Sequence, residues 1–320
     1  VLYNISEQFF VCTRKKDGKC QTALTNFTKE NAKMYCIIVN PNAGKGKGKK
    51  NLKTALKLFS ERGAEYSVFE TTRAGEAKEF SQRLTASGEK EIIVVGGDGT
   101  LHEVLNGLSD PSSCRLGLIP SGTGNDFAAA AGLPSNAAQA AEIILSGETK
   151  ETDFLCVGGV RCMNVGGLGM DVDVLVRCKK GRFVKGKIKY LLSLLQSLFT
   201  FKGYEIEIES GERRETHKAL IAVACNGTQI GGGIRICPAS VIDDGKIDVM
   251  AVECMGKAQI VKAFLYLMKG KVLDYPAAEH FLCERVKIVP SLPCTVQLDG
   301  ELYDGLEFDA RIERGLKMYR

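Results

Sequence analysis

VVGGDGTLHEVLNGL, residues 94–108, starts as an apolar run typical of a buried β-strand and ends as an amphipathic helix. Three glycines, Gly96, Gly97 and Gly99, lie between the two elements and leave the main chain open to close approach by a large ligand. Backbone N–H groups that face outward at a helix N-terminus bind anions. The turn therefore predicts a phosphate site at the end of a strand.

Two kinds of side chain in this turn give further predictions. Thr100 is expected to cap a helix that begins at Leu101, and Glu103 stands at the position that completes a capping box. Asp98 would repel a bare phosphate, so it indicates that a divalent cation accompanies a bound nucleotide. A carboxylate that only closes a tight turn remains the alternative for Asp98.

A second turn repeats this design after the next apolar run. PSGTGNDF, residues 120–127, carries a hydroxyl at Thr123 and places Asn125 and Asp126 at the start of a helix. Neither turn has the lysine of a Walker A loop or the spacing G-x-G-x-x-G. Positive charge could come from NAGKGKGKK, residues 42–50, for which a solvated loop is the alternative.

The order of predicted elements indicates an α/β fold with two domains. From Met34 onward, continuous apolar strands alternate with helices, which is typical of a parallel sheet covered on both faces. After about Asp153 the strands become short and alternating, which predicts an antiparallel β-sandwich or partly open barrel, with a boundary between Thr152 and Cys156. We expect an N-terminal extension of uncertain order, a parallel-sheet nucleotide-binding domain, a mostly antiparallel β-sandwich domain, and a tail that returns to the first domain, over residues 1–33, 34–153, 154–308 and 309–320.

Composition narrows the classes of partner. The 320 residues are 44% hydrophobic, and 43 Lys and Arg against 38 Asp and Glu give a net charge of +5. This mild excess suits an anionic ligand or membrane surface, and without an aromatic-rich RNA signature or zinc-finger spacing it does not predict nucleic-acid binding.

The twelve cysteines are scattered without C-x-x-C or histidine at zinc spacing, so we expect reduced thiols in a cytoplasm. The most apolar stretch, YLLSLLQSLF at residues 190–199, is too short to span a bilayer, which predicts a protein that is soluble or lies on a membrane surface.

Five motifs, in this order and spacing, resemble the diacylglycerol kinase catalytic-domain family, particularly its bacterial soluble lipid kinases. They are VNPNAGKG, GGDGTLHEVLNG, IPSGTGNDFA, DDGKIDV and LDGE. The resemblance covers Met34 to nearly the C-terminus and implies an NAD kinase-like first domain and a β-rich second domain around a cleft for ATP and lipid. It implies a Mg²⁺-dependent lipid kinase that transfers the γ-phosphate of ATP to a lipid hydroxyl, with diacylglycerol as the leading acceptor and phosphatidic acid as product.

The resemblance also implies site residues. The predicted nucleotide-binding set is Asn40, Thr71, Gly96, Gly97, Asp98, Gly99, Thr100, Leu101, His102, Thr123 and Asp126. The alignment of TTRAG leaves Thr72 as an alternative to Thr71. An acidic set near the catalytic magnesium falls on Asp98, Asp126 and Asp153, and we count Asp153 among the metal ligands. A structural magnesium is implied at Asp244, with backbone oxygens near Val241 and Lys246, where a plain β-turn is the alternative.

The resemblance places the catalytic carboxylate on Glu301, with Asp98 beside it. Phosphoryl transfer needs a base within hydrogen-bond reach of the acceptor hydroxyl. VQLDGELYDG, residues 296–305, puts Glu301 just past a strand end, in a glycine turn that is able to direct it into a cleft. The alternative is a hairpin of the Asp-Gly type with both acids solvated.

Three classes of function remain open at this point. A basic stretch, Lys179 to Lys189, precedes a predicted apolar helix, Ile188 to Phe199, which suits docking on anionic lipid at a membrane surface. Ordinary core packing explains these leucines as well. The alternatives to a lipid kinase are an NAD kinase-like enzyme for a soluble metabolite and a non-catalytic nucleotide-binding module at membranes. A homodimer is a further alternative among the partners.

Overall fold

The computed structural model describes residues 13–14, 20–21, 33–180, 196–197, 200–254 and 256–320. The chain divides into two units, Val1–Lys33 and Met34–Arg320. In the first unit, β1 (Thr13–Arg14) and β2 (Cys20–Gln21) pair antiparallel. Most of the predicted extension, of the basic stretch Lys179 to Lys189 and of the helix Ile188 to Phe199 lies outside the described residues.

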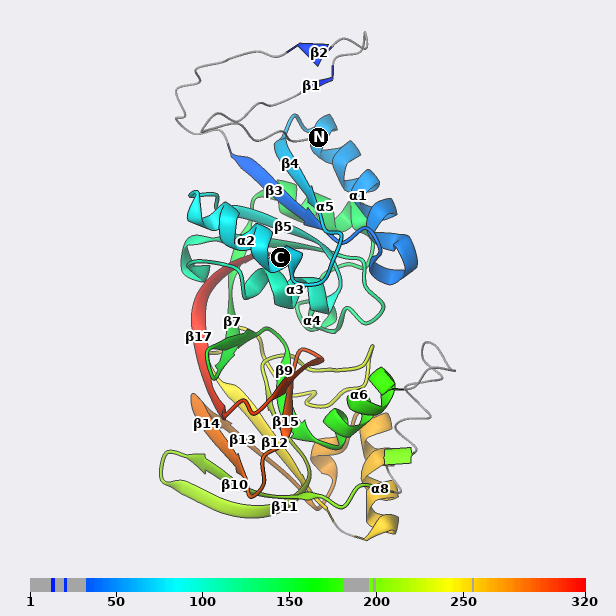
Figure 1. Cartoon of the computed structure of the whole chain (residues 1–320), viewed down its shortest axis with the longest axis vertical. Helices are drawn as coiled ribbons and strands as arrows, with labels where there is room; N and C mark the ends of the chain where they lie inside the picture. The colour runs from blue at the N-terminus through cyan, green and yellow to red at the C-terminus, as the bar shows by residue number, and fades with distance from the viewer. Residues whose placement is uncertain (1–12, 15–19, 22–32, 181–195, 198–199, 255) are drawn as a thin grey trace. The chain divides into compact units, whose positions relative to one another are not determined.

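The second unit begins with four parallel strands in the order β4-β3-β5-β6 (Figure 1). Their bounds are β3 Met34–Val39, β4 Glu65–Glu70, β5 Glu91–Gly96 and β6 Arg115–Pro120. The connecting helices are α1 Ala43–Glu61, α2 Glu76–Ala86, α3 Asp98–Leu105, η1 Pro111–Ser113, α4 Asp126–Ala130 and α5 Ala137–Ser146.

Alternate residues of these strands face two separate cores. In β5, Ile92 and Val94 pack with α2, α3 and α4, whereas Ile93 and Val95 pack with α1 and α5. This explains why the strands read as continuous apolar runs, because both faces of the sheet are buried. The sheet also brings the turns after β5 and β6 to one edge, since the carboxyl ends of parallel strands meet there.

The rest of the chain is mostly antiparallel and forms a β-sandwich. Its elements are β7 Thr149–Val157, β8 Val160–Cys162, β9 Val165–Gly169, α6 Met170–Lys180, β10 Tyr204–Ser210, β11 Arg213–Cys225, β12 Ile247–Glu253, α8 Lys257–Met268, η2 Val272–Asp274, β13 Ala278–Cys283, β14 Arg285–Pro290, β15 Thr295–Leu298, β16 Glu301–Asp304 and β17 Phe308–Tyr319. The strand order is β16-β15-β9-β11-β10-β14-β17, and β12 joins β11 to β13. The predicted fold class, a parallel α/β domain followed by an antiparallel sandwich, is confirmed.

The last strand belongs to both parts. β17 pairs antiparallel with β14 and then runs parallel to β6, with Lys317 opposite Arg115 (Figure 1). β7 accompanies it along both halves, with a register shift between Glu313 and Leu316. The predicted boundary between Thr152 and Cys156 therefore falls inside a continuous strand.

The predicted capping box at Thr100 is wrong. α3 begins at Asp98, after Gly97, and has no side-chain cap. Thr100 is buried beside Gly96, while the Glu103 carboxylate accepts hydrogen bonds from the N–H groups of Gly75 (2.9 Å) and Ala77 (3.2 Å) at the start of α2. Glu103 therefore caps the N-terminus of the neighbouring helix α2. This is a tertiary contact, which local sequence does not encode.

Part of the predicted lysine-glycine loop is helical. α1 begins at Ala43, and Gly44, Lys45 and Gly46 form a turn with positive φ before the regular helix. Gly48 is buried so close to the carbonyl oxygen of Asn40 that a Cβ would lie 2.0 Å from it. Among the helices of the described ranges, none combines the length and apolar character needed to cross a membrane.

Candidate functional site

The two glycine turns are in direct contact at the sheet edge. A Cβ on Gly97 would lie 2.8 Å from the Cα of Gly122, and a Cβ on Gly122 would lie 2.5 Å from the Cα of Gly97. Asn125 fixes the second turn, because its side-chain oxygen accepts a hydrogen bond from the Gly122 N–H (2.8 Å). The two glycines are thus required for the approach of one main chain to the other.

A cavity of about 500 Å³ opens over these turns and is lined by glycines, alanines and polar residues. Its walls come from the ends of β3, β4, β5 and β6 and from the start of α3. The lining residues are Asn40, Ala43, Thr71, Thr72, Arg73, Ala74, Ala77, Gly97, Asp98, Gly99, Thr100, Glu103, Gly122 and Thr123. Exposed glycine main chain near the start of a helix is suited to phosphate groups.

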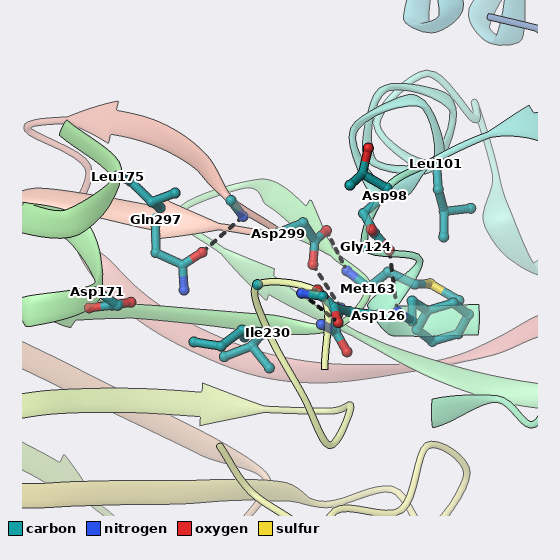
Figure 2. A pocket seen from close by; sticks show the side chains of 17 residues that line it. Asp98, Leu101, Gly124, Asp126, Met163, Asp171, Leu175, Ile230, Gln297 and Asp299 are labelled. Carbon is teal, nitrogen blue, oxygen red and sulfur yellow. Dashed lines mark hydrogen bonds between the residues drawn. The ribbon is translucent and has the colours of Figure 1, made fainter. Parts of the chain in front are cut away.

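A second cavity, of about 300 Å³, lies against the first and is largely apolar. Its apolar walls include Leu101, Phe127, Met163, Val165, Leu175 and Ile230. Asp98 and Thr123 line both cavities, so the two spaces meet at these residues. Figure 2 shows Asp98 and Leu101 at one end of this second cavity and Asp171, Leu175 and Gln297 at the other.

Two carboxylates converge where the cavities meet. Asp98 accepts hydrogen bonds from the N–H groups of Asn125 (2.8 Å) and Phe127 (3.3 Å), which joins the first turn to the second. Asp126 accepts hydrogen bonds from the N–H groups of Gly232 (2.9 Å to Oδ2) and Gly233 (3.0 Å to Oδ1), which bring a loop of the second domain to the cavity.

Burial, together with the negative charge of Asp126, raises the pKa of Asp98 to about 6. A Cβ on Gly124 would lie 3.1 Å from a carboxylate oxygen of each of these two aspartates, so the two groups are close neighbours. Hard oxygen donors of this kind are those that Mg²⁺ prefers, and their mutual repulsion is relieved by a divalent cation. The residues present therefore fit a magnesium ion at the junction.

A buried histidine connects the two domains beside this junction. The imidazole Nδ1 of His102 lies 2.8 Å from Oδ2 of Asp299, and its Nε2 lies 2.7 Å from the Tyr303 hydroxyl. Burial alone would raise the pKa of Asp299, but the hydrogen bond and charge of His102, with the N–H groups of Met163 and Asn164, outweigh it and hold that pKa below its usual value. Burial alone would lower the pKa of His102, because it disfavours the charged imidazole, but the hydrogen bond and the charge of Asp299 raise that pKa above its usual value. Because an ionised carboxylate only accepts hydrogen bonds, Nδ1 carries the proton in this pair.

The turn that carries Asp299 is an Asp-Gly hairpin. Leu298 pairs with Glu301, and Asp299 and Gly300 between them have φ of 54° and 86°, which defines a type I′ turn. The Asp-Gly hairpin alternative is thus present in the structure, but its two acids differ. The side chain of Asp299 is only 3% exposed, whereas Glu301 is exposed.

Glu301, the predicted catalytic carboxylate, is the first residue of β16. Its Oε1 lies 3.8 Å from the position that a Cβ would occupy on Gly99, which places it beside the first glycine turn. It does not line the apolar cavity, although its neighbours Asp299 and Gly300 do. The turn therefore directs Glu301 toward the main chain of the first glycine turn.

The far end of the apolar cavity contains a second buried acid that the sequence did not indicate. Burial raises the pKa of Asp171 to about 6, although the main chain of Val172 and the side chain of Gln297 act to lower it. Gln297, from β15, lines the same end. Asp171, Gln297 and Asp299 are polar groups of the site that sequence reasoning missed; of the three, only Asp299, in the LDGE motif, left a local signal.

The predicted nucleotide-binding residues separate into three groups. The first group lines the larger cavity and comprises Asn40, Thr71, Gly97, Asp98, Gly99, Thr100 and Thr123, with the alternative Thr72 also present. Leu101 and Asp126 line the apolar cavity. Gly96 and His102 line neither, because Gly96 packs against the Thr100 side chain and His102 faces Asp299.

Asp153, which the resemblance placed near the catalytic magnesium, lies instead at the turn that carries the predicted ligands of a structural magnesium. Asp153 is buried, and its Oδ2 accepts a hydrogen bond from the Gly245 N–H (2.6 Å). Its pKa is raised by burial, and its charged neighbours are Arg314, Asp244 and Asp243, so the structure does not place it with Asp98 and Asp126. Within residues 241–246, Val241 and Asp244 are exposed, and the Asp244 carboxylate accepts a hydrogen bond from the Lys246 N–H (2.9 Å).

Two neighbouring cavities that share Asp98 and Thr123, one lined by glycines and polar residues and the other largely apolar, suit an enzyme that binds two substrates. Residues 34–157 match the Diacylglycerol kinase catalytic domain, and residues 164–315 match the YegS C-terminal NAD kinase beta sandwich-like domain. The chain belongs to the diacylglycerol kinase catalytic-domain family, and it is a lipid kinase.

Individual relatives are similar to this chain along most of its length. A diacylglycerol kinase of Bacillus subtilis (strain 168) is 30% identical over 274 residues, which cover 84% of this chain and 90% of that protein. A diacylglycerol kinase of Staphylococcus epidermidis is 28% identical over 83% of this chain and 84% of its own length. The crystal structure of a diacylglycerol kinase from Bacillus anthracis str. Sterne superposes with a TM-score of 0.74 at 26% identity, over 91% of this chain and 98% of that one.

Proposed function

We propose that this lipid kinase transfers the γ-phosphate of Mg²⁺-ATP to the hydroxyl of diacylglycerol, giving phosphatidic acid and ADP. The single observation that carries the proposal is the meeting of the polar and the apolar cavity at Asp98 and Thr123. A phosphoryl group held in one cavity would there face a hydroxyl held in the other, which is the arrangement that in-line transfer requires. The names of the relatives support the choice of acceptor.

In this proposal the nucleotide occupies the larger cavity. Its phosphates would lie against the main chain of Gly97, Gly99 and Gly122, at the start of α3, where N–H groups favour negative charge. Thr71 and Asn40 would line the same space at the ends of β4 and β3. Mg²⁺, when bound near Asp98 and Asp126, would neutralise charge on the phosphates.

The acceptor would occupy the apolar cavity, with its acyl chains against Leu101, Phe127, Val165 and Ile230. We propose that its hydroxyl oxygen attacks the γ-phosphorus while the bond from that phosphorus to the bridging oxygen of the β-phosphate breaks. Glu301 would accept the hydroxyl proton, since an exposed carboxylate beside Gly99 is within reach of the phosphate-binding turn. Because lipid acceptors reside in bilayers, we place the reaction at a membrane surface.

A panel of acceptors tests this proposal. Purified protein, labelled ATP and Mg²⁺ would be incubated with mixed micelles of diacylglycerol, monoacylglycerol, phosphatidylglycerol, undecaprenol or a sphingoid base, and separately with NAD⁺. We expect the highest kcat/KM with diacylglycerol and labelled phosphatidic acid as the product. A higher kcat/KM with another lipid would change the acceptor, and phosphorylation of NAD⁺ in preference to lipid would overturn the proposal.

A further inference from the structure

A group of metal-ligating side chains lies in the second domain, away from both cavities. The Sγ of Cys237, a carboxylate oxygen of Asp248 and a ring nitrogen of His280 all lie within 4.8 Å of one another. The three residues come from the loop after β11, from β12 and from β13. None of them lines either cavity of the site described above.

The sheet register places a second cysteine, Cys225, beside this group. Cys225, the last residue of β11, pairs directly with Asp248, and Met250 pairs with His280. Side chains of directly paired residues lie on the same face of a sheet, as do those two positions apart on one strand. Cys225, Asp248 and His280 therefore share one face, and Cys237 packs onto that face in the same core cluster as Cys225.

Burial makes this cluster unusual. Both thiols are fully buried, and the Asp248 carboxylate is only 2% exposed. Asp248 Oδ1 lies 2.6 Å from Nε2 of His280, which compensates its charge.

We propose that Cys225, Cys237, Asp248 and His280 bind one zinc ion. Two thiolates, an imidazole and a carboxylate are ligands that Zn²⁺ takes, and four of them complete a closed structural site. Ligands at ordinary zinc distances lie about 3.3 to 3.8 Å apart in a tetrahedron, so Cys237, Asp248 and His280 need to contract only modestly around the ion. The side chain of Cys225, which lies outside that 4.8 Å group, would turn toward the ion to complete the set. Binding releases the thiol protons and the proton shared by Asp248 and His280.

The zinc would fix the base of a loop that reaches the phosphotransfer site. Cys225 and Cys237 flank residues 226–236, and this loop carries Gly232 and Gly233, whose N–H groups bind Asp126. Gln229 of the same loop donates a hydrogen bond to Asp126 (3.0 Å). Zinc is thus a structural clamp for one wall of the apolar cavity, and it takes no part in the transfer step.

Metal binding by the whole chain tests this inference directly. Protein purified under reducing conditions would be stripped of metal and titrated with Zn²⁺ and, separately, with Co²⁺. We expect one equivalent of either ion and, with Co²⁺, visible bands of tetrahedral coordination together with a thiolate-to-metal charge-transfer band. Cys237→Ser and His280→Ala should each weaken binding by at least about 100-fold, because each removes a ligand.

Matched variants separate this site from other thiols and histidines. Cys254→Ser changes a partly buried cysteine outside the cluster, and His217→Ala changes a histidine held by Glu253 and close to Glu215 and Glu279; both should bind Zn²⁺ like the wild type. Wild-type protein that is folded and reduced but takes up no Zn²⁺ or Co²⁺ would refute the inference, as would a Cys225–Cys237 disulfide found in protein handled under reducing conditions. This test measures metal binding and not lipid phosphorylation. A chain that binds no zinc would therefore leave the result of the acceptor panel unaffected, and a negative acceptor panel would leave the zinc result unaffected.

Discussion

The imidazole Nδ1 of His102 lies 2.8 Å from Oδ2 of Asp299, although 197 positions separate the two residues in the chain. Both side chains are almost fully buried, at 4% and 3% exposed. His102 comes from α3 of the first domain, and Asp299 comes from the hairpin of the second domain that carries Glu301. The pair therefore fixes the hairpin beside the first glycine turn.

Removal of one partner of the His102–Asp299 pair should lower the stability of the fold. We expect Asp299→Ala to lower the free energy of unfolding by about 3 to 5 kcal/mol, because it leaves His102 and the N–H groups of Met163 and Asn164 buried without their acceptor. Urea unfolding at pH 6 measures this loss. The control is Asp304→Ala, an exposed acid of the same hairpin, which should cost less than about 1 kcal/mol.

The contribution of the pair should also depend on pH in a defined direction. Asp299 has a lowered pKa, so its stabilisation is present above its ordinary value of 3.8 and is lost as the pH falls through the folded-state pKa. His102 has a raised pKa, so its stabilisation is complete below 6.5 and is lost as the pH rises through the folded-state pKa. The difference between wild type and Asp299→Ala should thus be largest between about pH 4 and 6.5 and should narrow above that range. A difference that grows steadily toward pH 9 would contradict this assignment.

The pH dependence of turnover should report Asp98. With a pKa of about 6, this carboxylate is ionised above pH 6, and kcat/KM should fall about tenfold for each pH unit below it. Asp126→Asn removes a neighbouring negative charge that raises this pKa, so it should move the acid limb to lower pH. Asp171, whose pKa is also about 6, provides the control, because Asp171→Asn should leave the limb where it is. If the acid limb of the kcat/KM profile moves with Asp171→Asn and not with Asp126→Asn, the titrating group is Asp171 and not Asp98.

Replacement of the proposed base should separate chemistry from binding. Glu301→Gln keeps the size of the side chain but cannot take a proton, so we expect kcat to fall by about 10² or more while the Kd for ATP stays within about twofold. Single-turnover kinetics and calorimetric nucleotide binding measure the two quantities. Glu307→Gln changes another exposed acid, one that pairs with Lys287, and should retain wild-type kcat. Full activity in Glu301→Gln would remove Glu301 from catalysis.

The contact between the two glycine turns should be intolerant of a methyl group. In Gly122→Ala the new Cβ would lie 2.5 Å from the Cα of Gly97, so the main chain must shift. We expect KM for ATP to rise at least about tenfold while the fold, followed by circular dichroism, is retained. Gly256→Ala is the matched control, because its Cβ would meet only the movable end of Gln259 at 3.0 Å. Unchanged KM in Gly122→Ala would show that the turn does not hold the phosphates.

Asp244 offers a test of the predicted structural magnesium. Three carboxylates, Asp153, Asp243 and Asp244, gather at this turn, and an ion that binds only the folded state raises Tm. We expect Mg²⁺ to raise the Tm of the wild type relative to chelator and Asp244→Ala to lose most of that rise. Asp304→Ala should retain it. A wild-type Tm that is the same with Mg²⁺ and with chelator would refute the predicted structural magnesium site.

The parallel half of the fold was predictable because its signals are local. Both faces of β5 are buried, so Ile92 to Val95 read as a continuous apolar run, and the glycine turns that follow β5 and β6 mark their own positions. The start of α3 was not predictable, because Glu103 satisfies the N-terminus of α2 and leaves its own helix uncapped. β13 escaped prediction for a similar reason, since its side chains alternate between half-buried and exposed and its pairing with β12 defines it.

The site was predictable only where its chemistry lies within one turn. The sequence indicated Asp98, Thr123 and Asp126 because each stands beside glycines at a strand end. Asp171 and Gln297 became part of the apolar cavity only through packing of α6 against β9 and β15, which no local pattern records. Cys237 and His280 likewise meet through the pairing of β11, β12 and β13, so the spacing of cysteines and histidines along the chain gave no indication of a shared ligand group.

The strand at the C-terminus has a consequence for synthesis on the ribosome. β6 gains its outer partner only when Lys317 and Met318 have been made and have left the exit tunnel. Until then the parallel sheet of the first domain presents an unpaired edge, a state in which nascent chains are prone to wrong association. Completion of the first domain thus waits for the final residues of the second, and a nascent chain halted before β17 should be captured by chaperones even though nearly all of its core residues are already present.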